Sequence, residues 1–426
     1  MRAALITILV AAFAAGIAYA APQWQGLINA PFAIRIDDLH FLDANSGWCA
    51  TGDGQIFHTT DGGATWQDQL TDPSVYFRCI RFADAMHGFA GTLSSDALMY
   101  RTVDGGAHWN LVTNIPNPQP SALCGMWAPT SQVIYGVGSY FGPARVIKSI
   151  DGGATWSSQD LAPLASTLID VYFKSATEGF AVGGVGTFPN MVRSVVMHTI
   201  DGGATWQRRF LGTRNGEWGW KISFPTPLVG YVSLEREGPP MFLLKTVNGG
   251  LNWTELAFEG YNEQGIGFVT TDVGWIGGAS NPTFGTTDGG ATWTQTPWGD
   301  YLNRFQFLSP TLGYGSGVTI YKYSDPTVGV PPVATPVTHP RAVPNPFGSR
   351  TSIQYALERP ERVQILVSDP AGRIVRRLAD GPQDTGPHVA EWDGADDRGV
   401  QTPAGIYLYI LHAGERHESG KIARVR

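Results

Sequence analysis

Charged residues recur at one place in a repeated sequence pattern. When seven alternating apolar segments are aligned, the residues at one equivalent position are Asp38, Cys79, Cys124, Asp170, Lys221, Gly265 and Arg304. Two carboxylates that face each other can act as acid and base in glycoside hydrolysis, and Asp38 with Asp170 would be that pair. Arginines that converge can hold a substrate carboxylate, and Arg35, Arg78 and Arg304 could converge. The pattern predicts a site where these segments meet.

Further candidates for ligand binding lie close to this position. They are Arg35, Asp37, Arg78, Arg81, Trp218, Trp220 and Glu263, with Tyr140, Phe141, Glu235 and Arg236 in nearby loops. Mixed charge beside aromatic rings suits a sugar or a peptide loop, and the alternative is a hydrated channel without a ligand. The sequence has no nucleophile-elbow, zinc-protease or phosphate-loop motif, so we expect no metal and no cofactor.

A repeat organises the first 320 residues. A nine-residue pattern occurs six times at intervals of 40 to 50 residues, for example HTTDGGATW at 58–66. Each copy follows an apolar alternation and a glycine–aromatic pair, so one unit contains four short strands, as a β-propeller blade does. A seventh unit lacks the DGG pattern, but Trp24-Gln25 matches Trp66-Gln67 and would supply its missing strand. We expect an all-β, seven-bladed propeller over 21–324.

The residues of each DGG turn have structural explanations. The aspartate can accept hydrogen bonds from nearby backbone N–H groups, and the two glycines allow the positive φ of a tight turn. We expect Trp66 to cover its turn and to pack toward the next blade. The turn residues with this structural role are Asp61, Trp66, Asp104, Trp109, Asp151, Trp156, Asp201, Trp206, Asn248, Trp253, Asp288 and Trp293.

Composition excludes several classes of protein. Only 15% of the 426 residues are charged, the net charge is −7, and glycine (53) and proline (29) are abundant. Such a chain is neither a helical bundle nor a polybasic binder of nucleic acid. The three cysteines provide no disulfide framework. They are either buried apolar residues or, for Cys79 and Cys124, a bridge between neighbouring repeats.

The two ends of the chain have their own signals. Residues 1–20 have a positive start, an apolar run and an Ala-Tyr-Ala ending, which predict a cleaved signal peptide and no later transmembrane segment. Residues 325–343 are rich in proline and predict a stiff linker. Residues 344–426 alternate in short strands, which predict a small Ig-like β-sandwich.

The DGG turns resemble the Asp-box (BNR) repeats of sialidase-type propellers. With the glycine–aromatic strand before each turn, residues 22–323 most resemble the propeller of photosystem II stability/assembly factors. The resemblance implies that the DGG turns lie on the face opposite the functional site. Asp-box propellers include sialidases, xyloglucan-cleaving glucanases, sortilin-type receptors and non-enzymatic assembly factors, so the resemblance indicates a fold more than a function.

The C-terminal segment resembles two related modules. Its NPF at 345–347, WDG at 392–394 and GIY at 405–407 are similar to the type IX secretion sorting domain and to the Ig-like domain of flagellar hook-capping proteins. The first resemblance implies export across the outer membrane by recognition of the tail. The alternative is an ordinary Ig-like accessory domain.

These observations favour a secreted or cell-surface, non-catalytic propeller that binds an extracellular glycan or protein and no nucleic acid. The secretion machinery of the outer membrane would be a second partner, through the tail. The alternative is a sialidase-like or glucanase-like glycosidase that uses Asp38, Asp170, Arg35 and Arg304. Two features argue against a sialidase. The resemblance implies an Arg-Ile-Pro motif, but this chain has Arg35-Ile36-Asp37 at that place, and no Tyr/Glu nucleophile pair can be assigned.

Overall fold

The computed structural model describes residues 23–324 and 340–425, apart from 163, 188, 237, 261–262, 280–281, 344, 358, 371, 384–385 and 415. The predicted signal peptide and most of the predicted linker lie outside these residues. The chain divides into two compact units, which meet in sequence at Gly329 and Val330. Within the described part, no helix is long and apolar enough to cross a membrane.

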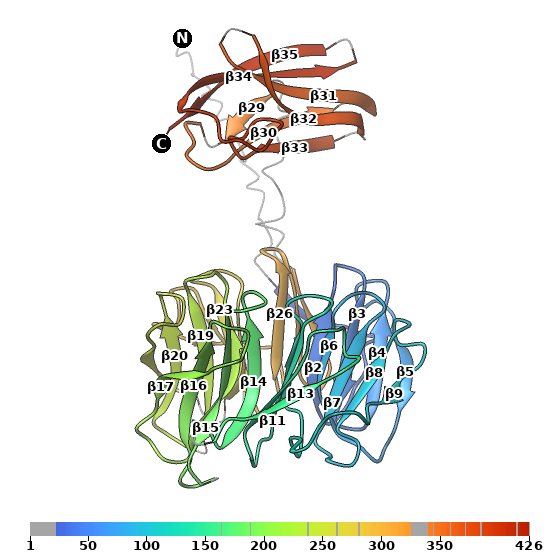
Figure 1. Ribbon diagram of the computed structural model, residues 1–426, viewed down its shortest axis with the longest axis vertical. Helices are drawn as coiled ribbons and strands as arrows, with labels where there is room; N and C mark the ends of the chain where they lie inside the picture. Colours follow the sequence, from blue (N-terminus) through green and yellow to red (C-terminus); the bar gives the residue numbers. More distant parts are fainter. Residues whose placement is uncertain are drawn as a thin grey trace, which may run out of the picture. The chain divides into compact units, whose positions relative to one another are not determined.

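The first unit consists of seven antiparallel sheets of four strands each (Figure 1). The first blade contains β2 (Ile36–Phe41), β3 (Gly47–Thr51), β4 (Gln55–Thr59) and β5 (Gln67–Thr71), and the second contains β6 (Phe77–Phe82), β7 (Gly88–Thr92), β8 (Met99–Thr102) and β9 (Asn110–Leu111). The third blade contains β10 (Gly125–Trp127), β11 (Ile134–Gly138), β12 (Arg145–Ser149) and β13 (Ser157–Asp160). The fourth contains β14 (Thr167–Phe173), β15 (Gly179–Val185), β16 (Arg193–Thr199) and β17 (Gln207–Leu211).

The remaining three blades complete the ring. The fifth blade contains β18 (Glu217–Ser223), β19 (Gly230–Arg236), β20 (Met241–Thr246) and β21 (Thr254–Phe258). The sixth contains β22 (Glu263–Phe268), β23 (Gly274–Gly278), β24 (Phe284–Thr286) and β25 (Thr294–Gln295). The seventh contains β26 (Arg304–Ser309), β27 (Leu312–Ser316), β28 (Ile320–Ser324) and β1 (Gln23–Gly26). The first strands of successive blades contact one another in order, and β26 contacts β2, which closes the ring. The predicted seven-bladed propeller is confirmed.

The first strand of the chain closes the last blade, as the sequence predicts. Strand β1 pairs antiparallel with β28, with Trp24 opposite Tyr323. The indole of Trp24 is 8% exposed and lies against Trp275, Trp298 and Phe305 with ring centroids 4.5–5.5 Å apart.

Each DGG turn is held by the aspartate and by a hydroxyl two residues before it. In the first turn, Asp61 Oδ1 accepts from the backbone N–H of Thr65 at 2.8 Å, and Thr59 Oγ1 accepts from the N–H of Gly63 at 2.9 Å. Gly62 and Gly63 have φ values of 69° and 91°, in the region that favours glycine. The hydrogen bonds to Asp61 lower the pKa of its carboxyl to about 2.

The tryptophans of the turns pack differently from the sequence prediction. Trp156 of the third blade contacts Phe89 of the second blade, with ring centroids 5.7 Å apart, and Trp253 of the fifth blade contacts Phe180 of the fourth. The expected contact toward the next blade is therefore wrong. The turn leans over the second strand of the preceding blade, where Tyr135 Oη donates to the carbonyl of Gly202 in the following turn at 2.9 Å.

The second unit is an antiparallel sandwich, as predicted. Its sheets contain β29 (Arg341–Val343), β30 (Thr351–Leu357) and β33 (Gly386–Trp392), and β32 (Ile374–Gln383), β31 (Glu361–Ser368), β34 (Gly405–Ala413) and β35 (Arg416–Arg424). Side chains from both sheets form one core around Trp392, which is fully buried.

The structure decides between the two alternatives for the cysteines, and the possible bridge between Cys79 and Cys124 is wrong. All three cysteines are free and buried. The thiol of Cys79 lies 3.6 Å from the carbonyl oxygen of Leu123, to which it donates. The cysteines are therefore small buried side chains, which was the other reading of the sequence.

Candidate functional site

The first strands of the blades, which we call the inner strands, surround the centre of the ring. Several of them carry one extra residue near their start, and these residues supply side chains to one end of the central channel. The pairing of β2 with β3 shifts register between Ile36 and Asp38, and the pairing of β6 with β7 shifts between Phe77 and Cys79. A β-bulge of this kind re-aims the extra side chain. Here the extra residues are Asp37 and Arg78. The corresponding shifts in β18 and β22 fall at Trp220 and Gln264.

The strand pairing also corrects one residue of the sequence alignment that placed Asp38, Cys124, Asp170 and Arg304 at equivalent positions. Asp38 pairs with Ala50, Asp170 with Val182 and Arg304 with Ser316, which are equivalent places in their blades. In the third blade the partner at that place, Val137, pairs with Gly125 rather than with Cys124. The alignment was wrong by one residue there because the third blade shows no register shift at that point.

Arg304 joins the two carboxylates that the sequence proposed as a catalytic pair. Its Nε lies 2.7 Å from Asp38 Oδ1, and its Nη2 and Nη1 lie 2.8 and 3.0 Å from the two oxygens of Asp170. Both aspartates are fully buried, and Arg304 is 7% exposed. Burial would raise the pKa of the Asp170 carboxyl, but Arg304 and then Lys221 outweigh it and hold the pKa below its usual range.

The ammonium group of Lys221 lies in the same cluster and makes no hydrogen bond to a described residue. Burial and the nearby charge of Arg304 lower the pKa of its ammonium group to about 8, against the opposing attraction of Asp170. Because Asp38 and Asp170 are occupied by Arg304, this cluster holds the ring together and offers no carboxylate to a substrate.

Along the inner strands, this cluster lies between two cavities that share no lining residue. Asp37 lines one cavity and Leu39 the other, with Asp38 between them. In β6, Arg78 lines the same cavity as Asp37, and Arg81, three residues further along the strand, lines the other. The expectation that Arg81 lies on the same rim as Arg78 is therefore wrong, because three residues of extended strand separate their Cα atoms by about 10 Å.

The first cavity, which we call the Arg78 cavity, has a volume of about 500 Å³. It is lined by Arg35, Asp37, Tyr76, Arg78, Leu93, Ser121, Ala122, Ser139, Tyr140, Phe141, Trp220, Glu235 and Gln264. These residues come from the starts of inner strands and from the loops between second and third strands. The DGG turns lie at the other end of the strands, where Gly62 N donates to the carbonyl of Asn45.

Two arginines stack on one indole in this cavity. The guanidinium carbons of Arg78 and Arg35 lie 4.9 and 5.7 Å from the ring of Trp220. Asp37 lies between the arginines, 2.5 Å from Arg35 Nε and 3.3 Å from Arg78 Nη1. Burial would raise the pKa of Asp37, but Arg78 and Arg35 outweigh it and hold the pKa below its usual range. Asn303 donates to Asp37 and accepts from Trp220 Nε1.

The Arg78 guanidinium retains unused donors. Arg78 is 4% exposed, and neither of its terminal nitrogens makes a hydrogen bond with a described residue. A buried guanidinium without hydrogen-bond partners is costly unless a ligand or water supplies them. The unused N–H groups therefore make this cavity suited to an anionic group.

A second carboxyl of the cavity has its pKa raised toward neutral pH. Glu235 accepts from Gln264 Nε2 at 2.6 Å and from Trp218 Nε1 at 2.9 Å. Burial raises the pKa of Glu235 to about 7, although the Gln264 hydrogen bond and the charge of Arg35 oppose the rise. Gln264 also accepts from Arg35 Nη2 at 2.5 Å, so the network runs from Trp218 through Glu235 to Asp37.

The structure thus separates the predicted site residues into groups. Arg35, Arg78 and Trp220 line the Arg78 cavity, and Asp38, Asp170, Lys221 and Arg304 form the buried cluster. Trp218 lies beside Arg236 in a smaller cavity of about 310 Å³. No group of acidic, histidine and cysteine side chains able to hold a metal occurs among the residues described.

Sequence reasoning missed Tyr76, Gln264 and Asn303. Tyr76 and Gln264 line the Arg78 cavity, and Asn303 supports it through Asp37 and Trp220. Gln264 follows Glu263, which was a candidate, and Asn303 precedes Arg304. Recognising the bulges would have identified Gln264, since the extra residues Asp37 and Arg78 of β2 and β6 line the same cavity.

Comparisons with known proteins match each of the two units. Residues 154–261 match the family model of the photosynthesis system II assembly factor YCF48, and residues 346–415 match the FlgD Ig-like domain. A curated relative from Synechococcus sp. (strain CC9902), photosystem II assembly lipoprotein Ycf48, is 24% identical over 296 residues, which is 63% of this chain and 79% of the relative.

Solved structures are similar in fold. YCF48 bound to D1 peptide has a TM-score of 0.55 at 18% identity, over 72% of this chain and 98% of that one. YCF48 from Cyanidioschyzon merolae has a TM-score of 0.56 at 16% identity, over 71% and 98%. The GH74 enzyme of Niastella koreensis has a TM-score of 0.53 at 14% identity, over 94% and 69%. The chain therefore combines a Ycf48-like propeller with a C-terminal FlgD-type Ig-like domain, and the predicted resemblances to these two modules are confirmed.

Proposed function

We propose that this chain is a non-catalytic binding protein whose Arg78 cavity holds an acidic segment of a partner protein. The single observation that carries the proposal is the pair of buried terminal nitrogens on Arg78, which make no hydrogen bond to a described residue although Nη1 lies 3.3 Å from Asp37 Oδ1. Hydrogen bonds between guanidinium and carboxylate are among the strongest available to proteins, and they fix orientation as well as charge.

The surroundings of the cavity favour a protein over a glycan. Phe141 and Leu93 line it and are 75% and 41% exposed, and Ile34, next to Arg35, is 81% exposed. Large apolar side chains that surround a buried charged anchor are typical of protein interfaces. An apolar rim with a cationic centre suits a peptide with an acidic residue or terminus between apolar residues.

The comparisons are compatible with this proposal. One structurally similar protein is YCF48 bound to D1 peptide, and the curated relative is named for assembly of a protein complex. Neither name refers to an enzymatic reaction. The partner of this chain need not be the partner of those proteins, since sequence identity is only 18–24%.

A peptide-display selection tests the proposal. The full chain is immobilised and exposed to a random peptide library, with the variant Arg78→Gln as the matched control. We expect the chain to enrich peptides that carry Asp, Glu or an acidic terminus, and the variant to lose this enrichment. Equal enrichment by both proteins, or no enrichment of acidic peptides, would contradict the proposal.

A glycosidase is the second candidate, with a different carboxyl pair from the one the sequence suggested. Glu235, with a pKa of about 7, and Asp37, with a lowered pKa, line the same cavity. Carboxyls whose environments move their pKa values apart can act as acid and base. Hydrolysis of nitrophenyl glycosides by the chain, and its loss in Glu235→Gln, would support this candidate. Absence of turnover would exclude it for those sugars.

We further propose that the chain is exported, with its C-terminal domain as the address. The pattern of residues 1–20 and the motifs of the tail support this proposal. In a bacterium that has type IX secretion, the full chain should reach the cell surface or the medium, and a chain that ends at Ser324 should stay in the periplasm. Equal export of both would leave the tail as an accessory domain.

A further inference from the structure

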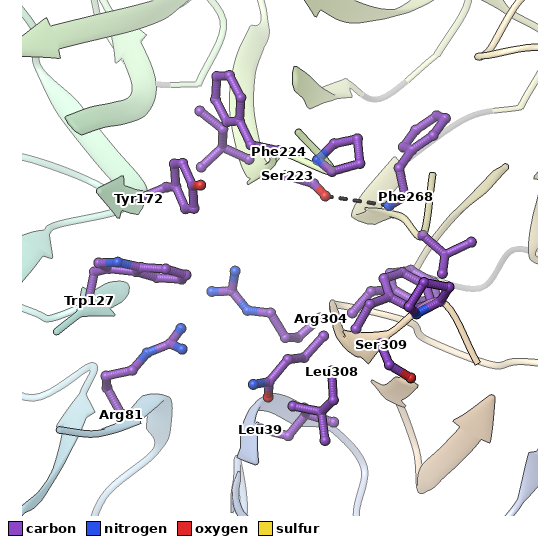
Figure 2. A pocket seen from close by; sticks show the side chains of 17 residues that line it. Leu39, Arg81, Trp127, Tyr172, Ser223, Phe224, Phe268, Arg304, Leu308 and Ser309 are labelled. Carbon is purple, nitrogen blue, oxygen red and sulfur yellow. Dashed lines mark hydrogen bonds between the residues drawn. The ribbon is translucent and has the colours of Figure 1, made fainter. Parts of the chain in front are cut away.

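The second cavity lies at the opposite mouth of the channel, on the face of the DGG turns. We call it the Arg81 cavity, and its volume is about 420 Å³ (Figure 2). Its outer wall includes Pro225, Val269 and Pro310, which belong to turns between first and second strands. Such turns lie beside the DGG turns, as the hydrogen bond from Gly152 N to the carbonyl of Gln132 shows for the third blade.

Arg81 is a buried cation without a carboxylate partner. It is 6% exposed, and its one hydrogen bond to a described residue runs from Nε to the carbonyl of Met126 at 3.3 Å. No described carboxylate lies within ion-pair distance, and the guanidinium stacks at 4.3 Å over the ring of Trp127. Burial lowers the pKa of Arg81 to about 10, which still leaves it charged at neutral pH. Its terminal N–H groups are therefore available to a ligand.

Two other donors point into the same space. Figure 2 shows the Arg304 guanidinium directed toward the open centre near Arg81, and the Tyr172 hydroxyl at the same centre on the other side of Trp127 from Arg81. Both terminal nitrogens of Arg304 donate to Asp170, and each retains a second N–H. The Tyr172 hydroxyl makes no hydrogen bond to a described residue, while its ring is fixed by Phe224, stacked at 5.1 Å. All three donors line one cavity, and its described lining contains no carboxylate.

The wall across from these donors is largely apolar, although Gln306 and Ser309 also line it. Phe305, Phe307 and Leu308 of β26 line it, together with Val269. In Figure 2, Leu308 lies on the far side of the centre from Trp127. A cavity that combines converging donors with an apolar wall accommodates a molecule with an anionic end and an apolar body.

We propose that the Arg81 cavity binds an organic acid whose carboxylate is held by Arg81, Arg304 and the Tyr172 hydroxyl. The body of the acid is an aromatic or short aliphatic group that lies against Phe307 and Leu308. The shared chemistry, a carboxylate on an apolar group, occurs both in a free aryl acid and in the C-terminal residue of a peptide. This site is separate from the Arg78 cavity, and neither proposal depends on the other.

Fluorine NMR of para-fluorobenzoate with the full chain tests the inference, with the neutral para-fluorobenzamide as the comparison ligand. We expect binding of the acid and not of the amide. Arg81→Gln should weaken binding about tenfold or more, because a hydrogen bond to a charged group is lost. Tyr172→Phe removes one oxygen and keeps the ring, and it should weaken binding about threefold to tenfold in a fully folded protein.

Arg78→Gln is the matched control, because it changes an arginine at the other mouth and should leave this binding unchanged. Equal binding of acid and amide would overturn the inference. The inference would also be overturned if the acid still bound to both Arg81→Gln and Tyr172→Phe, or if only Arg78→Gln lost binding of the acid. N-acetylphenylalanine represents the C-terminal residue of a peptide, and its amide is the neutral comparison ligand. Tighter binding of N-acetylphenylalanine than of para-fluorobenzoate would identify a peptide terminus as the source of the carboxylate, and the reverse order would identify a free aryl acid.

Discussion

Two carboxyls line the Arg78 cavity in different protonation states. Asp37 is ionised between Arg35 and Arg78, whereas Glu235 has its pKa raised to about 7 by burial. The groups that face Glu235 are Gln264, Trp218 and the two arginines, with the phenol of Tyr140 nearby. Ionisation of Glu235 therefore adds a negative charge to a site proposed for an anion.

The first prediction concerns pH. Affinity for an acidic peptide should fall roughly tenfold between about pH 6 and about pH 8, as Glu235 loses its proton and repels the ligand. Glu235→Gln should give a flat profile, which titrations by fluorescence anisotropy can measure. A pH dependence that persists in this variant would contradict the assignment.

The free energy of unfolding should also depend on pH through the carboxyl of Glu235. The pKa of Glu235 in the folded chain, about 7, lies above its ordinary value of 4.5. The folded state therefore binds more protons than the unfolded state in this range, so stability is fully present below about pH 4.5 and falls as the pH rises through about 7. Glu235→Gln should remove this part of the pH dependence of unfolding.

The second prediction concerns Arg304. Arg304→Met leaves Asp38 and Asp170 buried and unpaired, so it should reduce the free energy of unfolding by about 3–5 kcal/mol. Urea denaturation of the propeller measures the loss. The triple variant with Asp38→Asn and Asp170→Asn should recover much of it, because no buried charge remains without a partner. A single variant as stable as the unchanged chain would show that the cluster does not support the ring.

At the scale of the elements, the DGG turns explain why so much of the fold could be predicted. The turn residues, Asp61 for example, act within nine consecutive positions, and the repeat marks each blade. The site was less predictable because it depends on register. A one-residue bulge between Phe77 and Cys79 directs Arg78 into its cavity, and the alternation of polar residues does not contain that information.

The third prediction tests the contact between a turn and the preceding blade. Gly152 and Gly153 have φ values of 69° and 83°, so alanine at either position should cost about 1–2 kcal/mol. Only at Gly153 would the new Cβ approach the buried ring of Phe89, at 2.5 Å. Gly153→Ala should therefore lower the thermal midpoint clearly more than its neighbour, Gly152→Ala. Equal losses would show that the turn is not pressed onto the preceding blade.

At the scale of the whole molecule, the ring is closed by the pairing of β1 with β28, three hundred residues apart in sequence. The sequence predicted this closure from the match of Trp24-Gln25 with the turn residues of other blades. Closure removes the exposed edges that an open ring would have. It also fixes the inner strands that supply Arg35 and Arg304 to the channel.

The fourth prediction follows from that closure. Trp24→Ala removes a buried indole that contacts four other aromatic residues besides Tyr323. It should cost about 3–5 kcal/mol. Amide hydrogen exchange should accelerate in β28 and β27, while β12 of the third blade should exchange as before. Uniform acceleration in all blades would show that the effect is not one of ring closure.

The most direct test of the central claim is a double-mutant cycle between Arg78 and an acidic residue of a selected peptide. Affinities are measured for the chain and for Arg78→Gln, each with the peptide and with its Asp→Asn or Glu→Gln form. If the Arg78 cavity holds the acidic group, the two changes should be coupled by about 1.5–3 kcal/mol. Losses that simply add would place the acidic group elsewhere and contradict the proposed function.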